Sequence, residues 1–343
     1  MIELFRDEEY IMHRHTGNPI ITTDNFPVPS VRVFNCGQTV YEGKTVLLIA
    51  AQYKEKHNGS LTGIHLAMSE DGINFDISKK PFCAKTDWAG DFPLNCDCWV
   101  IDPRITKIDD TYYIVRPAQV EKVGPAAALE KTKDFKSLEF VECISLPNNR
   151  VPCLFPEKIN GQYVRLDRPY SVLRLDREKG GHPLDDQLLG GMWISYSPDM
   201  IYWGRHRPLF YPPLYFANYK VGPTPPIKTK EGWLEIIHGV YKENREWCYS
   251  LGAILLDLED PSKVIGVLDK PILTPNEPYE TDGLTKNVIF SCGAIADEKK
   301  DEIRIYYGAC DECIGLAVGS LSELINELKQ AIKFHIFYGG DYL

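Results

Sequence analysis

The chain has 343 residues, of which 44% are hydrophobic, and its net charge is −10 from 38 Lys and Arg against 48 Asp and Glu. This length allows a large core, and the acidic balance disfavours nucleic-acid or anionic-membrane partners, because such partners attract basic surfaces. No stretch reaches the roughly 18 consecutive apolar residues of a membrane span. The charged residues 1–15 do not resemble a signal peptide, so we expect ten reduced cysteines in a cytoplasmic protein.

A hairpin signal recurs five times along the chain. Each time, a short turn leads into a run rich in β-branched and aromatic residues, which is typical of two strands joined by a tight turn. The turns and the runs that follow are Glu42-Gly43 before 45–51, Asp109-Asp110 before 112–116, Asn160-Gly161 before 163–166, Glu231-Gly232 before 233–237, and Lys300-Asp301 before 303–307.

Between these hairpins lies a second recurring element, an acidic turn followed by another strand. Its aspartates, Asp71, Asp134, Asp199 and Asp260, are spaced about 60 to 65 positions apart. This spacing suits one four-stranded blade with its loops. The sequence therefore predicts an all-β fold, a single five-bladed β-propeller domain over residues 1–343. A β-sandwich or two small β domains are the alternatives, and the steady period disfavours both.

Two segments depart from the strand pattern. Residues 321–332 carry apolar side chains at helical spacing, which predicts a C-terminal helix on the outside of the propeller. Residues 171–191 are rich in Arg, Asp and Gly without periodicity, which predicts a long loop.

Two close cysteine pairs raise the question of a structural zinc site. Cys96 and Cys98 are separated by one residue, and Cys310 and Cys313 by two. Zinc usually draws on two pairs with suitable short spacing, so we expect ordinary buried thiols and no metal site.

The segment Asp102-Pro103-Arg104 stands directly before the second hairpin. A loop that enters the inner strand of a propeller blade can point toward the central channel, where ligands bind. From spacing alone, an ordinary turn with a surface ion pair is the favoured interpretation of this segment.

Several motifs in order along nearly the whole chain resemble those of glycoside hydrolase family 130, the β-mannoside phosphorylases and mannosidases. They are residues 32–35 (RVFN), 102–107 (DPRITK), 154–161 (LFPEKING), 168–169 (RP), 193–199 (WISYSPD), 220–222 (KVG), 231–233 (EGW), 238–240 (HGV), 251–253 (LGA) and 306–309 (YYGA). The resemblance implies a five-bladed propeller that cleaves β-mannosides with inversion, with Asp102 as the general acid. In an inverting phosphorylase the nucleophile is inorganic phosphate, so no metal or organic cofactor is implied.

The resemblance also implies a set of substrate- or phosphate-binding residues. Arg and Lys suit phosphate, as a bidentate fork and a point charge, and His can donate to an anion or sugar oxygen. Trp99 and Trp193 could stack on a sugar face or belong to the core. The implied binding residues are Asn35, Arg104, Arg168, Lys220, His238 and Asp311.

Two departures from the family pattern weaken the phosphate site. Gln52 ends the first hairpin strand, where many phosphorylases carry arginine, and Glu157 follows Phe-Pro, where some members have arginine. Glu157 could instead be the general base that activates water. If both cations are replaced, Lys54 or Lys56 would be the first substitutes to examine. Ile101, where many relatives have Glu or Tyr, leaves the subsite specificity open.

Three functions therefore compete. The favoured one is a phosphorylase that converts a short β-mannoside and phosphate into mannose 1-phosphate. The second is an inverting β-mannosidase with Glu157 as base, and the third is a catalytically silent sugar-binding propeller, which Asp102 disfavours. The sequence leaves the β-linkage, the acceptor sugar and the oligomeric state open, with a homo-oligomer as one candidate.

Overall fold

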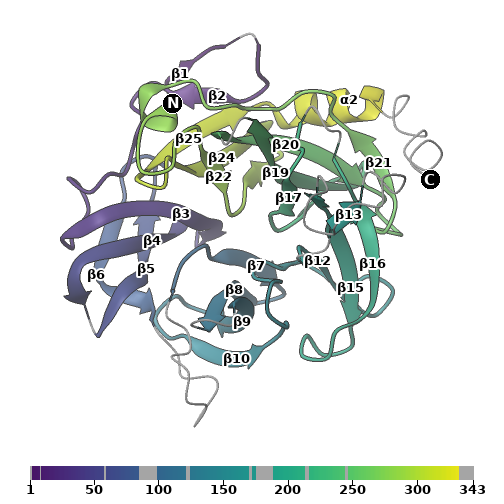
Figure 1. The fold of residues 1–343 in the computed structure, drawn as a ribbon, viewed down its shortest axis with the longest axis horizontal. Coiled ribbons are helices and arrows are strands. Elements are labelled where there is room, and N and C mark those ends of the chain that lie inside the picture. The colour runs from purple at the N-terminus through teal and green to yellow at the C-terminus, as the bar shows by residue number, and fades with distance from the viewer. Residues whose placement is uncertain are drawn as a thin grey trace.

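The strands of the protein form five sheets that surround a common centre (Figure 1). The computed structural model describes residues 2–7, 9–57, 59–84, 99–120, 124–169, 172–174, 188–212, 216–243 and 246–331. Each sheet is one blade, and β7 (Arg104–Ile108), β17 (Lys220–Pro223) and β22 (Ile289–Ser291) are among the strands that lie toward the middle of the ring. The predicted five-bladed all-β propeller is confirmed.

The first three blades each contain four strands in the order in which the chain visits them. Blade 1 holds β3 (Ser30–Tyr41), β4 (Lys44–His57), β5 (Ser60–Ser69) and β6 (Asp76–Cys83). Blade 2 holds β7 (Arg104–Ile108), β8 (Thr111–Val120), β9 (Gly124–Thr132) and β10 (Glu139–Cys143). Blade 3 holds β11 (Cys153–Leu154), β12 (Tyr163–Asp167), β15 (Met192–Ser197) and β16 (Gly204–Phe210).

Blade 4 has a longer sheet because two short strands extend its inner edge. Its members are β13 (Val172–Arg174), β14 (Leu188–Gly190), β17 (Lys220–Pro223), β18 (Ile227–Lys228), β19 (Trp233–Glu243), β20 (Glu246–Leu256) and β21 (Val264–Val267). β14 joins β17 in parallel through the pair Gly190↔Lys220. The predicted loop over 171–191 is therefore wrong for β13 and β14, and its residues 175–187 lie outside the described part of the chain.

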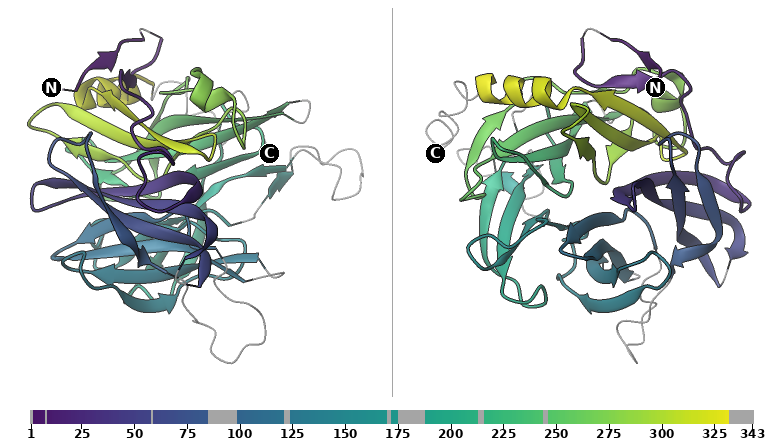
Figure 2. Two further views of the ribbon diagram at one scale, coloured as in Figure 1. Left: turned by 90° about the vertical axis from the view of Figure 1, so that its left-hand side faces the viewer. Right: turned by 180° about the vertical axis from the view of Figure 1, so that it is seen from behind.

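The N-terminus completes the last blade and closes the ring. Blade 5 combines β22 (Ile289–Ser291), β23 (Ile295–Asp297), β24 (Glu302–Ala309) and β25 (Cys313–Gly319) with β2 (His13–His15) and β1 (Leu4–Phe5). β2 pairs with β25 through His13↔Val318, and the N-terminal strands lie against the C-terminal blade in each view (Figure 2). This pairing covers the backbone edge of β25, which would otherwise be exposed to other chains.

The predicted hairpin turns occur where the sequence places them. Glu42 and Gly43, between β3 and β4, both have positive φ (49° and 79°), as do Asn160 and Gly161 before β12 (51° and 77°). Two consecutive positive φ values are the backbone pattern that matches the twist of a tight hairpin. In each blade, this turn and the loop that leads into the first strand lie at opposite ends of that strand.

The predicted acidic turns are also present, and their aspartates cap the backbone. Asp71, Asp134 and Asp199 each accept hydrogen bonds from the N–H groups two and three residues later. Asp260 accepts one from Ser262. Such bonds stabilise the turn that leads into the outer strand of the blade.

Apolar side chains fill the spaces between neighbouring blades. One cluster joins Val46 and Leu48 of blade 1 to Ile105 and Ile114 of blade 2. The C-terminal helix α2 (Leu321–Ala331) packs Leu324 and Leu328, among others, against the outside of the propeller. This confirms the predicted helix up to Ala331, and Ile332 lies outside the described residues.

The other described helix is α1 (Pro278–Thr281), which precedes blade 5. Within the described residues, no helix is long and apolar enough to cross a membrane.

Candidate active site

Asp102 lies in the loop that leads into β7 and is only 1% exposed. Its φ of 50° is in the left-handed region, which costs about 1–3 kcal/mol for a residue other than glycine. Arg104 holds this loop in place, because its guanidinium donates a hydrogen bond from Nη1 to the Asp102 carbonyl oxygen at 2.6 Å. This bond fixes the backbone from which the Asp102 carboxyl group extends.

Asn35 fixes the carboxyl group of Asp102 from blade 1. It lies at a bulge in β3, where the register shifts between Phe34 and Cys36, with a φ of 41°. Its Nδ2 donates to Asp102 Oδ1 at 2.8 Å. Gly308 of β24 packs so closely that a Cβ atom there would overlap Asn35 Oδ1, so glycine is required at this contact.

Asp311 supplies a second carboxylate from the turn between β24 and β25. It too has a positive φ (58°), and Thr285 Oγ1 donates to its Oδ2 at 2.8 Å. Burial raises the pKa of Asp311, and the negative charge of Asp102 raises it further. Asn35, Asp102 and Asp311 thus share a left-handed backbone conformation, which in this propeller also occurs in hairpin turns such as those of Glu42 and Asn160.

Three cationic or basic side chains meet beside these groups, from blades 3 and 4. Arg168 follows β12, His238 lies in β19, and Lys220 begins β17. Arg168 Nη1 lies 3.0 Å from His238 Nε2, and since Arg can only donate, Nε2 is the acceptor. Gly222 pairs with His238 in the sheet, and a Cβ atom on Gly222 would overlap the imidazole and crowd Arg168. Glycine at this position therefore allows the two basic side chains to meet.

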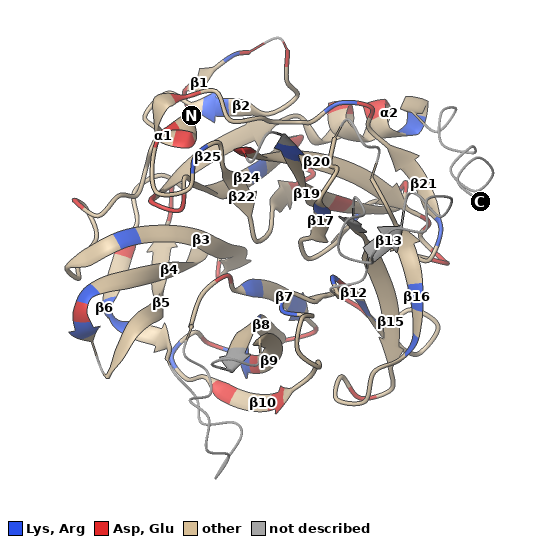
Figure 3. Ribbon diagram, in the orientation of Figure 1, with Lys and Arg blue, Asp and Glu red and all other residues tan. Residues whose placement is uncertain are grey.

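Their electrostatics show a local excess of positive charge. Burial, with Arg168 and Arg150 nearby, lowers the pKa of Lys220 to about 7. Burial and the charges of Arg150 and Arg104 lower the pKa of Arg168 to about 9. Burial and the neighbouring cations also lower the pKa of His238 far below its usual range, so its imidazole is neutral at neutral pH. Lys and Arg lie on β7 and β17 beside the middle of the ring (Figure 3).

Two residues that contact this group were missed from the sequence. Arg150 Nη2 contacts Asp102 Oδ2 at 3.3 Å, so it links the acid to the cations. Tyr249 of β20 has its ring 5.2 Å from Lys220 Nζ. A signal for Arg150 was available, because it stands in the loop before the first strand of blade 3, as Asp102 does in blade 2. We call the set Asn35, Asp102, Arg150, Arg168, Lys220, His238 and Asp311 the central cluster.

Glu157 lies outside the central cluster. Its side chain is 45% exposed and forms an ion pair with Lys228 Nζ at 2.6 Å. Lys228 pairs with Trp233, whereas Lys220 pairs with Val240, seven residues further along β19 (240 − 233). At 3.3 Å per residue, Lys228 and Lys220 are roughly 23 Å apart along the strand. The structure therefore does not bring Glu157 to Asp102, because Glu157 belongs to the hairpin end of blade 3.

The other predicted groups also have definite places. Arg104 is fully buried under Asp102, with its guanidinium 5.4 Å from the ring of Phe290. Lys54 and Lys56 are exposed on β4. Trp99 packs against Phe34, Ala50 and Ile101.

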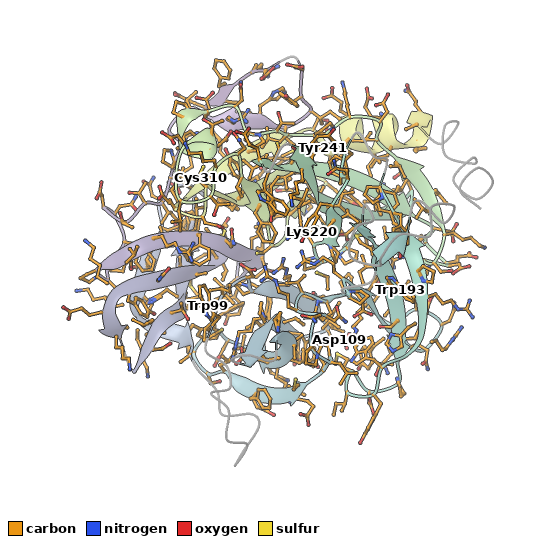
Figure 4. All side chains as sticks on the ribbon, viewed as in Figure 1. Trp99, Asp109, Trp193, Lys220, Tyr241 and Cys310 are labelled. Carbon is orange, nitrogen blue, oxygen red and sulfur yellow. The ribbon has the colours of Figure 1, made fainter. Side chains whose placement is uncertain are left out.

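Trp193 is half-buried in β15. Figure 4 shows Lys220 near the middle of the ring, with Trp99 and Trp193 farther from it. Of the two cysteine pairs, Cys96 and Cys98 lie outside the described residues, and among those described no group of three His, Cys, Asp or Glu could hold a metal ion.

Comparison with known proteins agrees with this arrangement. A family model described as beta-1,4-mannooligosaccharide phosphorylase, that of glycoside hydrolase family 130, matches residues 6–330. The chain belongs to glycoside hydrolase family 130. It is 38% identical over 278 residues to a beta-1,2-mannobiose phosphorylase of Listeria innocua, covering 80% of this chain and 71% of the relative.

Two further matches cover nearly the full length of both chains. A beta-1,4-mannooligosaccharide phosphorylase of Ruminococcus albus is 32% identical over 320 residues, which are 93% of this chain and 91% of the relative. The solved structure of a beta-1,2-mannobiose phosphorylase from Listeria innocua, in complex with beta-1,2-mannobiose, superimposes with a TM-score of 0.75 at 30% identity. That match covers 93% of this chain and 99% of the solved one.

Proposed function

We propose that this family 130 protein is an inverting phosphorylase, which cleaves the β-mannosidic linkage of short manno-oligosaccharides and forms mannose 1-phosphate. The observation that carries the proposal is the group of Arg150, Arg168 and Lys220 beside the buried acid Asp102. Desolvation and the neighbouring cations lower the pKa of both Arg168 and Lys220, an anion bound among them would counter this, and phosphate is the anion that a phosphorylase needs. The relatives from Listeria and Ruminococcus are both named as phosphorylases of β-mannosides.

The chemistry requires one proton donor and one nucleophile on opposite faces of the mannosyl unit. The Asp102 carboxyl group would protonate the glycosidic oxygen as the C1–O bond breaks. A phosphate oxygen, held by Arg168 and Lys220, would form the new bond to C1 from the other face. The remaining P–OH proton then returns to the Asp102 carboxylate, which balances the proton count.

The other members of the central cluster would orient these groups. Asn35 holds one oxygen of Asp102, which leaves the other for the proton and for Arg150. Asp311, as a buried carboxyl group, can accept hydrogen bonds from sugar hydroxyls. Arg104 was expected to bind substrate or phosphate, and its burial under the Asp102 carbonyl supports a positioning role instead.

Hydrolysis loses its main support. The proposed base, Glu157, is paired with Lys228 at the hairpin end of its blade. An inverting hydrolase places its two carboxyl groups about 6.5–9.5 Å apart to hold one water between them. Asp311 is the carboxyl group that shares the site with Asp102, and the cations beside them favour an anionic nucleophile over water.

The test is to incubate the enzyme with β-1,2- and β-1,4-mannobiose, with and without inorganic phosphate. Phosphorus NMR would follow mannose 1-phosphate, and an enzymatic assay would follow free mannose. We expect one of the disaccharides to be consumed only with phosphate, giving equal amounts of mannose and mannose 1-phosphate. Release of mannose at the same rate without phosphate would overturn the proposal in favour of hydrolysis.

A further inference from the structure

A groove of about 620 Å³ lies between blades 2 and 3, apart from the central cluster. One wall comes from the residues after β10, including Leu146 and Asn149. The other wall comes from blade 3, with Trp193, Tyr202 and Trp203. Its volume falls within the usual range for small-molecule sites.

The rim of this groove is apolar at positions where the fold does not require apolar residues. Tyr202 is 75% exposed and Leu146 is 83% exposed. Ile201 and Tyr202 are the two turn residues whose N–H groups bond to Asp199. The position of Tyr202 is polar in the other blades that share this turn, with Asn74, Ser137 and Lys263, whereas the position of Ile201 is also isoleucine, Ile73, in blade 1. The turn itself therefore tolerates polar residues, and blade 3 differs at the groove.

The floor of the groove is polar but electrically neutral. Arg165 and Asp167, both 2% exposed, form an ion pair at 2.9 Å, so they cancel each other's charge. The Arg165 guanidinium also stacks on the Trp203 ring at 4.2 Å and fixes its orientation. Asn149 Nδ2 donates to Asp167 Oδ1 at 2.8 Å. Aromatic faces above neutral hydrogen-bonding groups suit a ligand with both apolar faces and hydroxyl groups, which describes an uncharged sugar.

We propose that this groove is a second carbohydrate-binding site, which takes a neutral β-linked manno-oligosaccharide. The identity of the sugar rests on the proposed function, whereas the groove and its chemistry do not. The site would be linked to the central cluster through Asn149, because Asn149 Oδ1 accepts from the Arg168 backbone N–H at 3.0 Å while its amide nitrogen holds Asp167. An oligosaccharide in the groove would therefore contact the residue that fixes the backbone of Arg168.

The test is isothermal titration of β-linked mannohexaose into the Asp102→Asn chain, which would not consume the sugar. We expect two sites per chain. Adding Tyr202→Ala should weaken one of them about tenfold or more, since the phenol ring supplies an exposed apolar face at little cost to folding. The matched control is Phe5→Ala, another exposed aromatic residue (58%) on β1, which should leave both sites unchanged.

A single site per chain, or two sites that Tyr202→Ala leaves unchanged, would overturn the proposal. So would a concentration-dependent dimer that Tyr202→Ala dissociates in the absence of any second sugar site, because the groove would then be an interface between copies of this chain. Failure of the proposed function is seen separately, as the inability of the parent enzyme to convert mannobiose with phosphate.

Discussion

Two kinds of cation occur in this propeller, buried ones away from its centre and partly exposed ones in the central cluster, and their surroundings differ. Arg14, in blade 5, meets Glu280 through two hydrogen bonds at 2.9 and 2.8 Å, and Glu280 also accepts from Tyr307. Arg165, in blade 3, is paired with Asp167. In the central cluster, by contrast, Arg168 donates to the neutral His238 and has Arg150 and Lys220 as neighbours.

This difference separates cations that serve the fold from cations that serve a ligand. A buried charge is costly unless it is paired, and Arg14 and Arg165 each have a carboxylate partner, whereas the buried Arg104 donates to the Asp102 carbonyl oxygen. The central cluster also contains the carboxyl groups of Asp102 and Asp311. The three side chains Arg150, Arg168 and Lys220 still outnumber them. We infer that the missing negative charge arrives with the substrate.

The largest expected effect concerns the acid itself. Asp102→Asn should fold normally and lose about 10²–10⁴-fold in kcat on mannobiose, because an amide cannot protonate the departing oxygen. With an activated aryl mannoside, whose leaving group needs no proton, the loss should be far smaller. Steady-state kinetics on both substrates provide the measurement, and an equal loss on both would mean that Asp102 is not the proton donor.

A structural pair should respond through stability. Glu280→Gln leaves the Arg14 charge buried without its partner, and breaking such a pair costs about 3–5 kcal/mol of unfolding free energy. Denaturant unfolding would measure this loss of unfolding free energy. The control is Asp110→Asn, which breaks the exposed ion pair with Lys133 and should have little effect, because surface ion pairs contribute little to stability. Unchanged stability of Glu280→Gln would contradict the structural role of the pair.

Lys220→Met, in contrast to Glu280→Gln, should lose phosphate affinity and keep its stability. In the native state the pKa of Lys220 is about 7, below its ordinary 10.5, so the unfolded chain binds more protons between these values. Lys220 therefore destabilises the native state within this pH range, and less so as the pH rises through it. Without anions, the variant should be at least as stable as the parent, while its KM for phosphate rises about tenfold or more. A loss of stability with an unchanged KM would place Lys220 among the structural cations.

The smallest effect is expected at Glu157. Glu157→Gln removes only a half-exposed ion pair with Lys228, and such pairs contribute about 0–1 kcal/mol. Phosphorolysis and stability should both remain at the parent level. Loss of turnover with retained sugar binding would restore Glu157 as a catalytic base.

The propeller could be predicted because its signals are local and repeated. Turn pairs such as Asn160-Gly161 and capping residues such as Asp199 determine their own backbone conformation, and both recur in several blades. The strands β13 and β14 could not be predicted, since each has three residues and depends on the edge of β17.

The site was predictable only in part. Asn35, Asp102, Arg168, Lys220, His238 and Asp311 were named through family motifs, and the fold brings them together. Arg150 was missed although it stands, like Asp102, in the loop before the first strand of its blade, and its contact with Asp102 is visible only in the structure. Glu157 was considered as a catalytic base opposite Asp102, but it lies at the hairpin end of its blade. A sequence motif does not show at which end of a strand a residue lies.

The most direct measurement of the central claim is the proton balance of anion binding. Sulfate keeps its double negative charge throughout neutral pH, so any proton taken up when it binds is bound by a group of the protein and is supplied by the buffer. Titration calorimetry at about pH 7.5, in two buffers of different ionisation enthalpy, should show uptake of roughly half a proton or more per sulfate, because a nearby anion raises the pKa of Lys220 from about 7. This uptake should be absent in Lys220→Met. Sulfate binding without proton uptake, or with the same uptake in Lys220→Met, would contradict the account.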